Sequence, residues 1–254
     1  MSAQQTRSNR APTPVEVASP LCVYRYTTPT PTGDIVVLVD ADGAVRLCNW
    51  TDCEKDAVLR LRRAYQPREV VIADAAVTAQ EDDGDSVTGD VRAHAMRQMR
   101  RYFSCPPLRK GDLGESGDME DSVSGRQQKL HALLGSVSVR CPPSKPFMQA
   151  AWAALREVRP GETTTYGALA RRCQRPNASR AVGRAMRENH VCLFLPCHRV
   201  VGASWALTGF GPGLWRKAWL LRHEQAAIPV WQTQHVESGV QASFFKRERE
   251  VEGK

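Results

Sequence analysis

The sequence lacks any long apolar run. No uninterrupted hydrophobic stretch in its 254 residues approaches the roughly 18 that a membrane-spanning helix requires. It also lacks an apolar segment near its start: residues 1–20 are polar and include three prolines, whereas a secretory signal carries about 7–15 apolar residues. We therefore expect a soluble protein with no membrane partner, not exported, that begins with a flexible leader over residues 1–20.

Metal-binding cysteine spacing is absent too. Eight cysteines are present, but none forms a Cys-x-x-Cys pair of the zinc-ribbon type. A chain this long can bury a core without disulfides, so we expect reduced thiols. Cys22, Cys48 and Cys53 leave open a structural zinc, but cysteines in strands are more often small core residues. We predict no metal and no cofactor.

Acidic side chains are scarce in one third of the chain, residues 151–224. Residues 151–224 contain twelve Arg and Lys against four Glu and therefore carry the whole formal net charge of +8. A basic segment beside a neutral one favours a polyanionic partner, because neutralised phosphates release counterions. On charge alone, a solvated basic surface is an equally good interpretation.

The first half of the chain predicts an α+β domain over residues 21–104. Short β-branched and aromatic runs at residues 22–26, 34–40 and 44–47 are divided by turn sequences and predict an antiparallel meander. Apolar residues at helical spacing predict helices over residues 53–65 and 91–103.

The composition changes after this domain. Residues 105–144 are rich in Gly, Ser, Asp, Glu and Lys and predict a flexible insertion or linker, with a short helix near residues 127–134. Helical periodicity resumes over residues 146–158 and opens a second domain over residues 145–228. A polar tail over residues 229–254 follows.

The second domain contains the outline of a helix-turn-helix. Residues 166–173 predict a short helix, and Asn177 is expected to cap a second helix that runs to residue 189. Arg180, Gly183 and Arg187 recur at helical spacing on one face with Arg184. Such a face suits phosphate contact in a DNA groove, although periodicity alone is equally compatible with a solvated helix.

The chemically distinctive residues follow a strand-like run at residues 191–195. Cys197 precedes His198 directly, and a cysteine becomes a useful nucleophile when a base or a positive charge favours its thiolate. Because adjacent side chains on an extended segment point apart, we expect a bridging water between them. Glu224, at the end of a helix over residues 214–224, is a candidate to orient the imidazole. By themselves, these features are also compatible with a cysteine hydrolase, or with a Cys-His pair that only packs in the core.

A longer match narrows these alternatives. Residues 196–200 read Pro-Cys-His-Arg-Val, which resembles the active-site motif of O6-alkylguanine-DNA alkyltransferases. Four further segments of this chain resemble segments of that family. Residues 161–170 resemble its first DNA-binding helix and residues 176–183 its recognition helix, while residues 208–214 resemble its pocket loop and residues 217–224 its closing helix. The resemblance is strong over residues 146–224, whereas the N-terminal half matches only through residues 45–50.

This resemblance implies a fold and a function. The fold would be an RNase H-like α+β domain followed by a mostly helical winged-helix or helix-turn-helix domain. The activity would be a single irreversible transfer of an alkyl group from O6-alkylguanine, or O4-alkylthymine, in double-stranded DNA onto Cys197. The damaged base would be flipped out of the duplex, with the recognition helix in the minor groove. We expect a monomer.

The resemblance also implies roles for individual residues. Cys197 would be the acceptor, His198 would take its proton through water, and Glu224 would hold the imidazole. Asn189 would brace the adjoining turn, Tyr166 would protonate the departing guanine, and Arg180 would fill the gap in the duplex. Further DNA contacts are expected from Ala178, Ser179, Gly183, Arg187 and Tyr166. The predicted substrate pocket consists of Val191, Ala203, Phe210, Gly211, Pro212 and Arg199.

The chain departs from the family pattern at His190, Trp205, Phe210 and Pro212. We expect Pro212 and Trp205 to narrow the pocket and alter the range of alkyl groups accepted. A non-enzymatic protein that only recognises alkylated DNA is the alternative function, but the presence of Cys197 argues against it. The substrate implies the nucleus of a eukaryote, which the long insertion and tails favour, or the cytoplasm of a bacterium.

Overall fold

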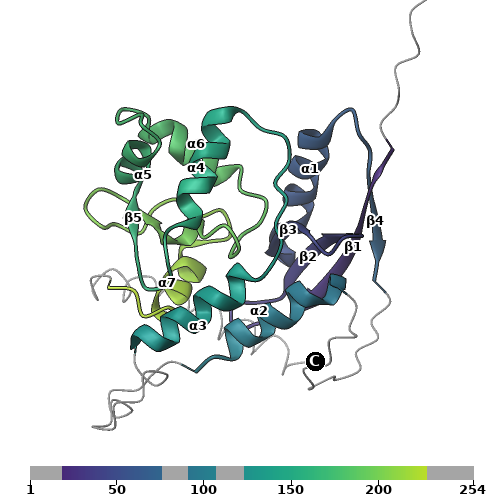
Figure 1. Cartoon of the computed structure of the whole chain (residues 1–254), viewed down its shortest axis with the longest axis horizontal. Helices are drawn as coiled ribbons and strands as arrows, with labels where there is room; N and C mark the ends of the chain where they lie inside the picture. The colour runs from purple at the N-terminus through teal and green to yellow at the C-terminus, as the bar shows by residue number, and fades with distance from the viewer. Residues whose placement is uncertain (1–18, 76–90, 107–122, 228–254) are drawn as a thin grey trace, which may run out of the picture.

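The computed structural model describes residues 19–75, 91–106 and 123–227, and the structure below is that of these residues. Figure 1 shows a β-sheet at one side of the molecule and a group of helices at the other, with α2 and α3 along the lower edge of the view. The fold is mixed α+β, as the sequence predicted. The predicted leader lies outside the described residues except for positions 19 and 20, and the predicted polar tail lies wholly outside them.

The sheet contains four strands in the order β3-β2-β1-β4. These are β1 (Leu21–Thr28), β2 (Ile35–Asp40), β3 (Val45–Trp50) and β4 (Val70–Asp74). β1 pairs antiparallel with β2, and β2 pairs antiparallel with β3, which confirms the predicted meander. The sequence did not predict β4, which pairs parallel to β1, because only its first residue is buried and no alternation marks it.

Helices cover both faces of the sheet. α1 (Glu54–Tyr65) packs Ala57 and Leu61 against one face, and α2 (His94–Ser104) packs Met99 and Tyr102 against the other. Every residue of β2 is consequently buried, which explains its continuous apolar run. Both helices confirm their predictions, although α2 is preceded by a 3-10 turn, η2 (Val91–Ala93).

The predicted flexible linker is wrong for residues 123–144. This region contains a helix, α3 (Val123–Gly135), whose Leu130 and Leu134 belong to the main hydrophobic core. The short helix predicted near residues 127–134 lies inside it. A few buried side chains on a polar helix are enough for packing against α2, and average composition conceals them. Residues 107–122 of the predicted linker lie outside the described part.

The remaining helices form a compact group beside the sheet (Figure 1). They are α4 (Pro146–Arg156), α5 (Tyr166–Arg172), α6 (Ser179–Arg187) and α7 (Leu214–His223), with two short parallel strands, β5 (Thr164–Thr165) and β6 (Val200–Val201). α4 contacts both α5 and α6, and Trp152 Nε1 donates to the Ala185 carbonyl at 2.9 Å. Among the described helices, none combines the length and apolarity that crossing a bilayer demands.

The prediction that Asn177 caps the second DNA-binding helix is wrong. α6 begins at Ser179, and its N-cap residue is Ala178, which supplies no side-chain hydrogen bond. The Ala178 N–H donates to the Arg175 carbonyl at 2.9 Å. Asn177 therefore belongs to the turn between α5 and α6.

The run at residues 191–195 is a tight turn tied to the sheet, not the predicted strand. The Cys48 N–H of β3 donates to the His190 carbonyl at 2.8 Å, and the Cys192 N–H donates back to the Cys48 carbonyl at 2.9 Å. Leu193 reverses the chain with φ at 72°. One hydrophobic cluster includes residues of both halves, among them Trp50 and Leu195. The N-terminal sheet thus positions the segment that leads to Cys197.

Candidate active site

Cys197 opens a 3-10 turn, η4 (Cys197–Arg199), and is nearly buried, with 6% exposure. The Asn189 side-chain amide donates to its Sγ at 3.0 Å and to the Leu195 carbonyl at 2.9 Å. Asn189 Oδ1 accepts from the Val191 N–H at 2.9 Å. One amide side chain therefore fixes the turn and contacts the thiol, the place that the sequence predicted for Asn189.

Neighbouring groups favour the ionised thiol. The adjacent Cys192 thiol lowers the pKa of Cys197; burial opposes this, and the Asn189 amide and the Lys217 ammonium lower the pKa further. Lys217 Nζ donates to the Val200 and Thr208 carbonyls, both at 2.6 Å. Burial lowers the pKa of Lys217 to about 8. Because the thiolate is the reactive form, this environment prepares Cys197 for nucleophilic attack.

His198 is fully buried and contacts Glu224, as the sequence predicted. Its Nε2 lies 3.1 Å from Glu224 Oε1. Burial lowers the pKa of His198, although the Glu224 carboxylate opposes that shift. In the neutral ring Nε2 carries the hydrogen and donates it to Glu224, which leaves the Nδ1 lone pair free. Nδ1 is buried without a hydrogen-bond partner among the described residues, so it is available as a base.

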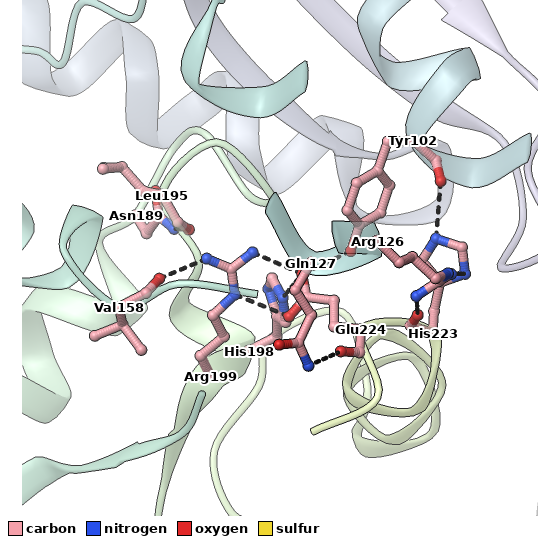
Figure 2. A network of polar contacts seen from close by, with 10 residues as sticks. All are labelled: Tyr102, Arg126, Gln127, Val158, Asn189, Leu195, His198, Arg199, His223 and Glu224. Carbon is pink, nitrogen blue, oxygen red and sulfur yellow. Dashed lines mark hydrogen bonds and ion pairs between the residues drawn. The ribbon is translucent and has the colours of Figure 1, made fainter. Parts of the chain in front are cut away.

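Glu224 is the centre of a buried polar network (Figure 2). Oε1 accepts from the Tyr102 hydroxyl and from the Arg199 guanidinium, both at 2.7 Å, and Oε2 accepts from Arg199 Nε at 2.9 Å. Burial opposes ionisation, but the charges of Arg199 and His198 hold the pKa of Glu224 well below its usual range. Glu224 is therefore a fixed anion that orients the imidazole.

α3 closes this network from the side (Figure 2). The buried Arg126 guanidinium donates to the His223 carbonyl and to the Cys105 carbonyl at 3.1 Å. Gln127 Nε2 donates to the Glu224 carbonyl at 3.3 Å. These donors satisfy backbone carbonyls at the C-terminal ends of α7 and α2.

A cavity of about 510 Å³ opens beside Cys197. The predicted residues that line it are Tyr166, Gly183, Arg187, Asn189, Cys197, Phe210, Gly211 and Pro212. Cys192 and Met186 line it as well. The N-terminal half supplies a wall that the sequence did not predict, formed by Asn49, Cys53, Asp56 and Arg60.

Three predicted pocket residues do not line this cavity. Val191 is buried and bridges to Cys48 of β3, and Ala203 is exposed. The assignment of Arg199 to the pocket is wrong, because its guanidinium is buried against Glu224 and behind the site. Adjacency to Cys197 in the sequence gave no information about that direction.

The exposed face of α6 lies beside the cavity. Arg180, Arg184 and Arg187 are exposed, while Val182, Ala185 and Met186 are buried. Ala178 and Ser179 precede or open the helix and are partly buried. Tyr166, which opens α5, directs its hydroxyl to the Gly209 carbonyl at 3.4 Å and the Thr208 carbonyl at 3.5 Å. Of the predicted DNA-binding residues, Tyr166, Gly183 and Arg187 line the cavity, whereas Ala178, Ser179 and Arg180 lie at the N-terminal end of α6.

Comparison with known proteins identifies the family. Residues 146–226 match the family model described as the 6-O-methylguanine DNA methyltransferase, DNA binding domain. The methylated-DNA–protein-cysteine methyltransferase of Mycobacterium leprae is 38% identical over 123 residues, which cover 48% of this chain and 74% of that protein. The chain belongs to the methylated-DNA–protein-cysteine methyltransferase family. The Haemophilus influenzae member is 43% identical over 112 residues, or 43% of this chain.

The match to several members of this methyltransferase family is partial. It covers 59% of the Haemophilus influenzae protein and 46% of the Salmonella typhimurium protein, so the chain spans about half the length of these relatives. Among solved structures, Mycobacterium tuberculosis OGT in complex with DNA is similar, with a TM-score of 0.51 and 22% identity. The alignment covers 84% of this chain and 98% of that one, which shows a shared fold.

Some site residues of this methyltransferase-family chain had no signal in the sequence. Tyr102 and Arg60 lie more than ninety residues from Cys197 in the sequence and reach the site through packing. The sequence predicts Lys217 only as a residue of the closing helix, without a role in the site. In the structure Lys217 is fully buried, and a lysine is almost never fully buried unless its charge is paired. Its burial therefore indicates a role in the site.

Two remaining expectations concern metal binding and pocket shape in this methyltransferase-family chain. In the described part, no group of three or more His, Cys, Asp or Glu is arranged to hold a metal ion. Pro212 lines the cavity. Trp205 is 45% exposed and is not a lining residue, so the structure gives it no part in narrowing the pocket.

Proposed function

We propose that this protein repairs DNA by transferring an alkyl group from the O6 atom of guanine to the Cys197 sulfur, once and irreversibly. The observation that carries this proposal is the position of the Cys197 thiol. It faces a cavity large enough for a base, and beside it stand a neutral buried histidine and a fixed carboxylate. O4-alkylthymine is a second proposed substrate.

The reaction requires a thiolate and a protonated leaving group. Nδ1 of His198 receives the Cys197 proton through a water molecule, while Glu224 holds the imidazole by its other nitrogen. The sulfur–carbon bond forms as the carbon–oxygen bond breaks, and the electron pair of that bond passes to guanine. Guanine then takes a proton, which balances the one that Cys197 lost. Because the product is a stable thioether, each molecule acts once.

Tyr166 is the proposed donor of the proton to guanine. Its ring lines the cavity, and burial raises the pKa of Tyr166, so the hydroxyl stays protonated and can donate. Guanine is a better leaving group as the neutral base than as its anion. The carbonyls of Thr208 and Gly209 hold the hydroxyl in place before the substrate arrives.

Double-stranded DNA is the proposed partner. The target oxygen cannot reach a buried sulfur while the base is stacked, so the nucleotide must be flipped out, at a cost of a few kcal/mol. Arg180 on the exposed face of α6 enters the duplex and fills the gap. The family resemblance supports a winged-helix or helix-turn-helix domain bound in the minor groove, and an RNase H-like N-terminal domain.

Intact-mass measurement after incubation with an O6-methylguanine duplex tests this function. We expect a stoichiometric gain of one methyl group that peptide mapping assigns to Cys197. Cys197→Ala should gain nothing, and Cys173→Ala, which removes a thiol outside the cavity, should behave as the unaltered protein. If the unaltered protein binds the duplex and gains no mass, the chain is a recognition protein and not a transferase.

A further inference from the structure

The cavity beside Cys197 has a charged wall that belongs to the N-terminal half of the chain. Asp56 and Arg60 lie four residues apart on α1 and both line the cavity, so they share one face of the helix. Arg187 of α6 lines it from the other half of the chain. The charged residues of the lining are thus one carboxylate and two guanidinium groups. None of the three is needed for the chemistry at sulfur.

Arg60 differs from the buried arginines of this protein. Arg126, Arg199 and Arg216 each donate to several carbonyls or carboxylates, so their guanidinium groups are occupied within the fold. Arg60 is half-buried, and its Nε is buried without a hydrogen-bond partner among the described residues. A buried donor left unpaired is costly, which makes it a natural contact for a ligand.

Arg60 lines the cavity near Cys53 and the buried His190. Lys217 is the cation that acts on the Cys197 thiol. Arg60 instead acts on Cys53: burial raises the pKa of Cys53, and the charge of Arg60 opposes that shift. α1 and α6 flank the same cavity from the two halves of the molecule (Figure 1). Arg60 and Arg187 therefore line, from two different helices, the space beside Cys197.

We propose that Arg60 binds a phosphate group of the strand that delivers the flipped nucleotide, so that α1 of the N-terminal half is part of the DNA-binding surface. This inference rests on the proposed repair function. A guanidinium presents its donors in a planar fork that matches phosphate oxygens. Arg187 faces the same strand from α6, and the two arginines hold the extruded nucleotide between them.

The test compares a substrate that has phosphates with one that has none. Single-turnover methyl transfer is measured for the full chain with an O6-methylguanine duplex and with O6-methylguanine as the free base. Arg60→Gln should slow the reaction with the duplex about tenfold, the loss of one charge-assisted hydrogen bond. The reaction with the free base should not change. Arg60→Lys should restore part of the rate, because the charge remains.

A control variant and a salt series sharpen the comparison. Arg62→Gln removes an exposed charge two positions away, on another side of α1, and should leave both rates as they are. For Arg60→Gln, the plot of log Kd against log salt concentration should become shallower by about 0.9, the contribution of one phosphate contact. Melting temperatures of all variants establish that each is folded.

Different failures have different meanings. If the unaltered protein transfers no methyl group, the proposed function fails before Arg60 is tested. If transfer occurs and Arg60→Gln reacts with the duplex at the unaltered rate, the phosphate contact is refuted. An equal loss with duplex and free base also refutes it, because Arg60 would then support the site itself.

Discussion

At the scale of single residues, Lys217 supplies a buried positive charge to the site. It is fully buried, yet its ammonium group lies near the Cys197 thiol and is held by two backbone carbonyls. Burial lowers the pKa of Lys217 to about 8, while the Cys197 charge opposes that shift. The positive charge and the thiolate therefore stabilise each other at neutral pH.

Lys217→Met should consequently shift the pH dependence of alkyl transfer. In the unaltered protein the rate should rise with pH and level off below the ordinary thiol value of 9.0, because the pKa of Cys197 is lowered. Without the ammonium group the rise should move to higher pH, and the rate at neutral pH should fall about tenfold for each pH unit of that move. Single-turnover rates across pH measure this, with exposed Lys129→Met as the control. An unmoved profile would contradict the assigned role.

The motif did not determine the orientation of the His198 ring. Its place next to Cys197 in the sequence did not fix where its ring points. The structure directs Nε2 to a carboxylate that also receives the Tyr102 hydroxyl and the Arg199 guanidinium. Three donors on one carboxylate keep it ionised and hold the imidazole in one tautomer.

At the scale of elements, the sheet of the N-terminal half supports the loop that lines the cavity. Trp50, at the end of β3, is fully buried and donates through Nε1 to Thr32 Oγ1 at 3.0 Å. Its ring meets Phe210 edge to face at 5.9 Å between centroids, and the Arg216 guanidinium lies 5.1 Å from it. Arg216 in turn donates to the Pro212 carbonyl at 2.9 Å. β3 thereby fixes the pocket loop.

Trp50→Leu tests this support. Loss of a large buried aromatic side chain should lower the free energy of unfolding by about 3 kcal/mol. It should also slow alkyl transfer, because Phe210 and the loop that follows it lose their contact. Trp205→Leu is the matched control: that tryptophan is 45% exposed, and its loss should change stability by less than about 0.5 kcal/mol. Denaturant unfolding and alkyl-transfer rates of both variants measure these effects. Equal effects of the two substitutions would refute the conclusion that β3 supports the pocket loop.

At the scale of the whole molecule, buried histidines make folding depend on pH. His223 joins α7 to α2 through the Tyr102 carbonyl at 2.8 Å and stacks on Trp219 at 4.8 Å. Burial lowers the pKa of His223 from 6.5 to about 4. Burial also lowers the pKa of His190 and of His198. All three rings are neutral in the folded protein and become charged more readily in the unfolded chain.

The direction of the pH effect follows from proton uptake. The unfolded chain protonates these histidines near pH 6.5, while folded His223 resists protonation until about pH 4. The stability is therefore complete above pH 6.5 and falls as the pH drops towards 4, by roughly 3 kcal/mol for His223 alone. Below about pH 4.5 the unfolded chain also protonates Glu224, whereas the folded protein keeps this carboxylate ionised, so the stability falls further. Unfolding measured across this range checks the slope. Exposed His131→Gln should leave the slope unchanged, and a flat curve in the unaltered protein would refute the argument.

Local chemistry and periodicity were sufficient for part of this protein. The meander, α1, α2 and α4, the arginine face of α6 and the motif around Cys197 were all predicted, because each depends on residues close together in the sequence. The contact between His198 and Glu224 was predicted as well, since Glu224 ends a recognisable helix. The charge of +8 in residues 151–224 is compatible with a polyanionic partner, but by itself it fits a solvated basic surface equally well.

Only the tertiary structure decided what the two halves do for each other. It placed Arg199 behind the site and made α3 part of the core in place of a linker. It also brought Tyr102 to Glu224 and Arg60 to the cavity beside Cys197. No local pattern encodes these contacts, because they depend on how whole elements pack. The local sequence therefore predicted the candidate groups of the site, whereas packing determined their orientation, their ionisation and the cavity wall opposite them.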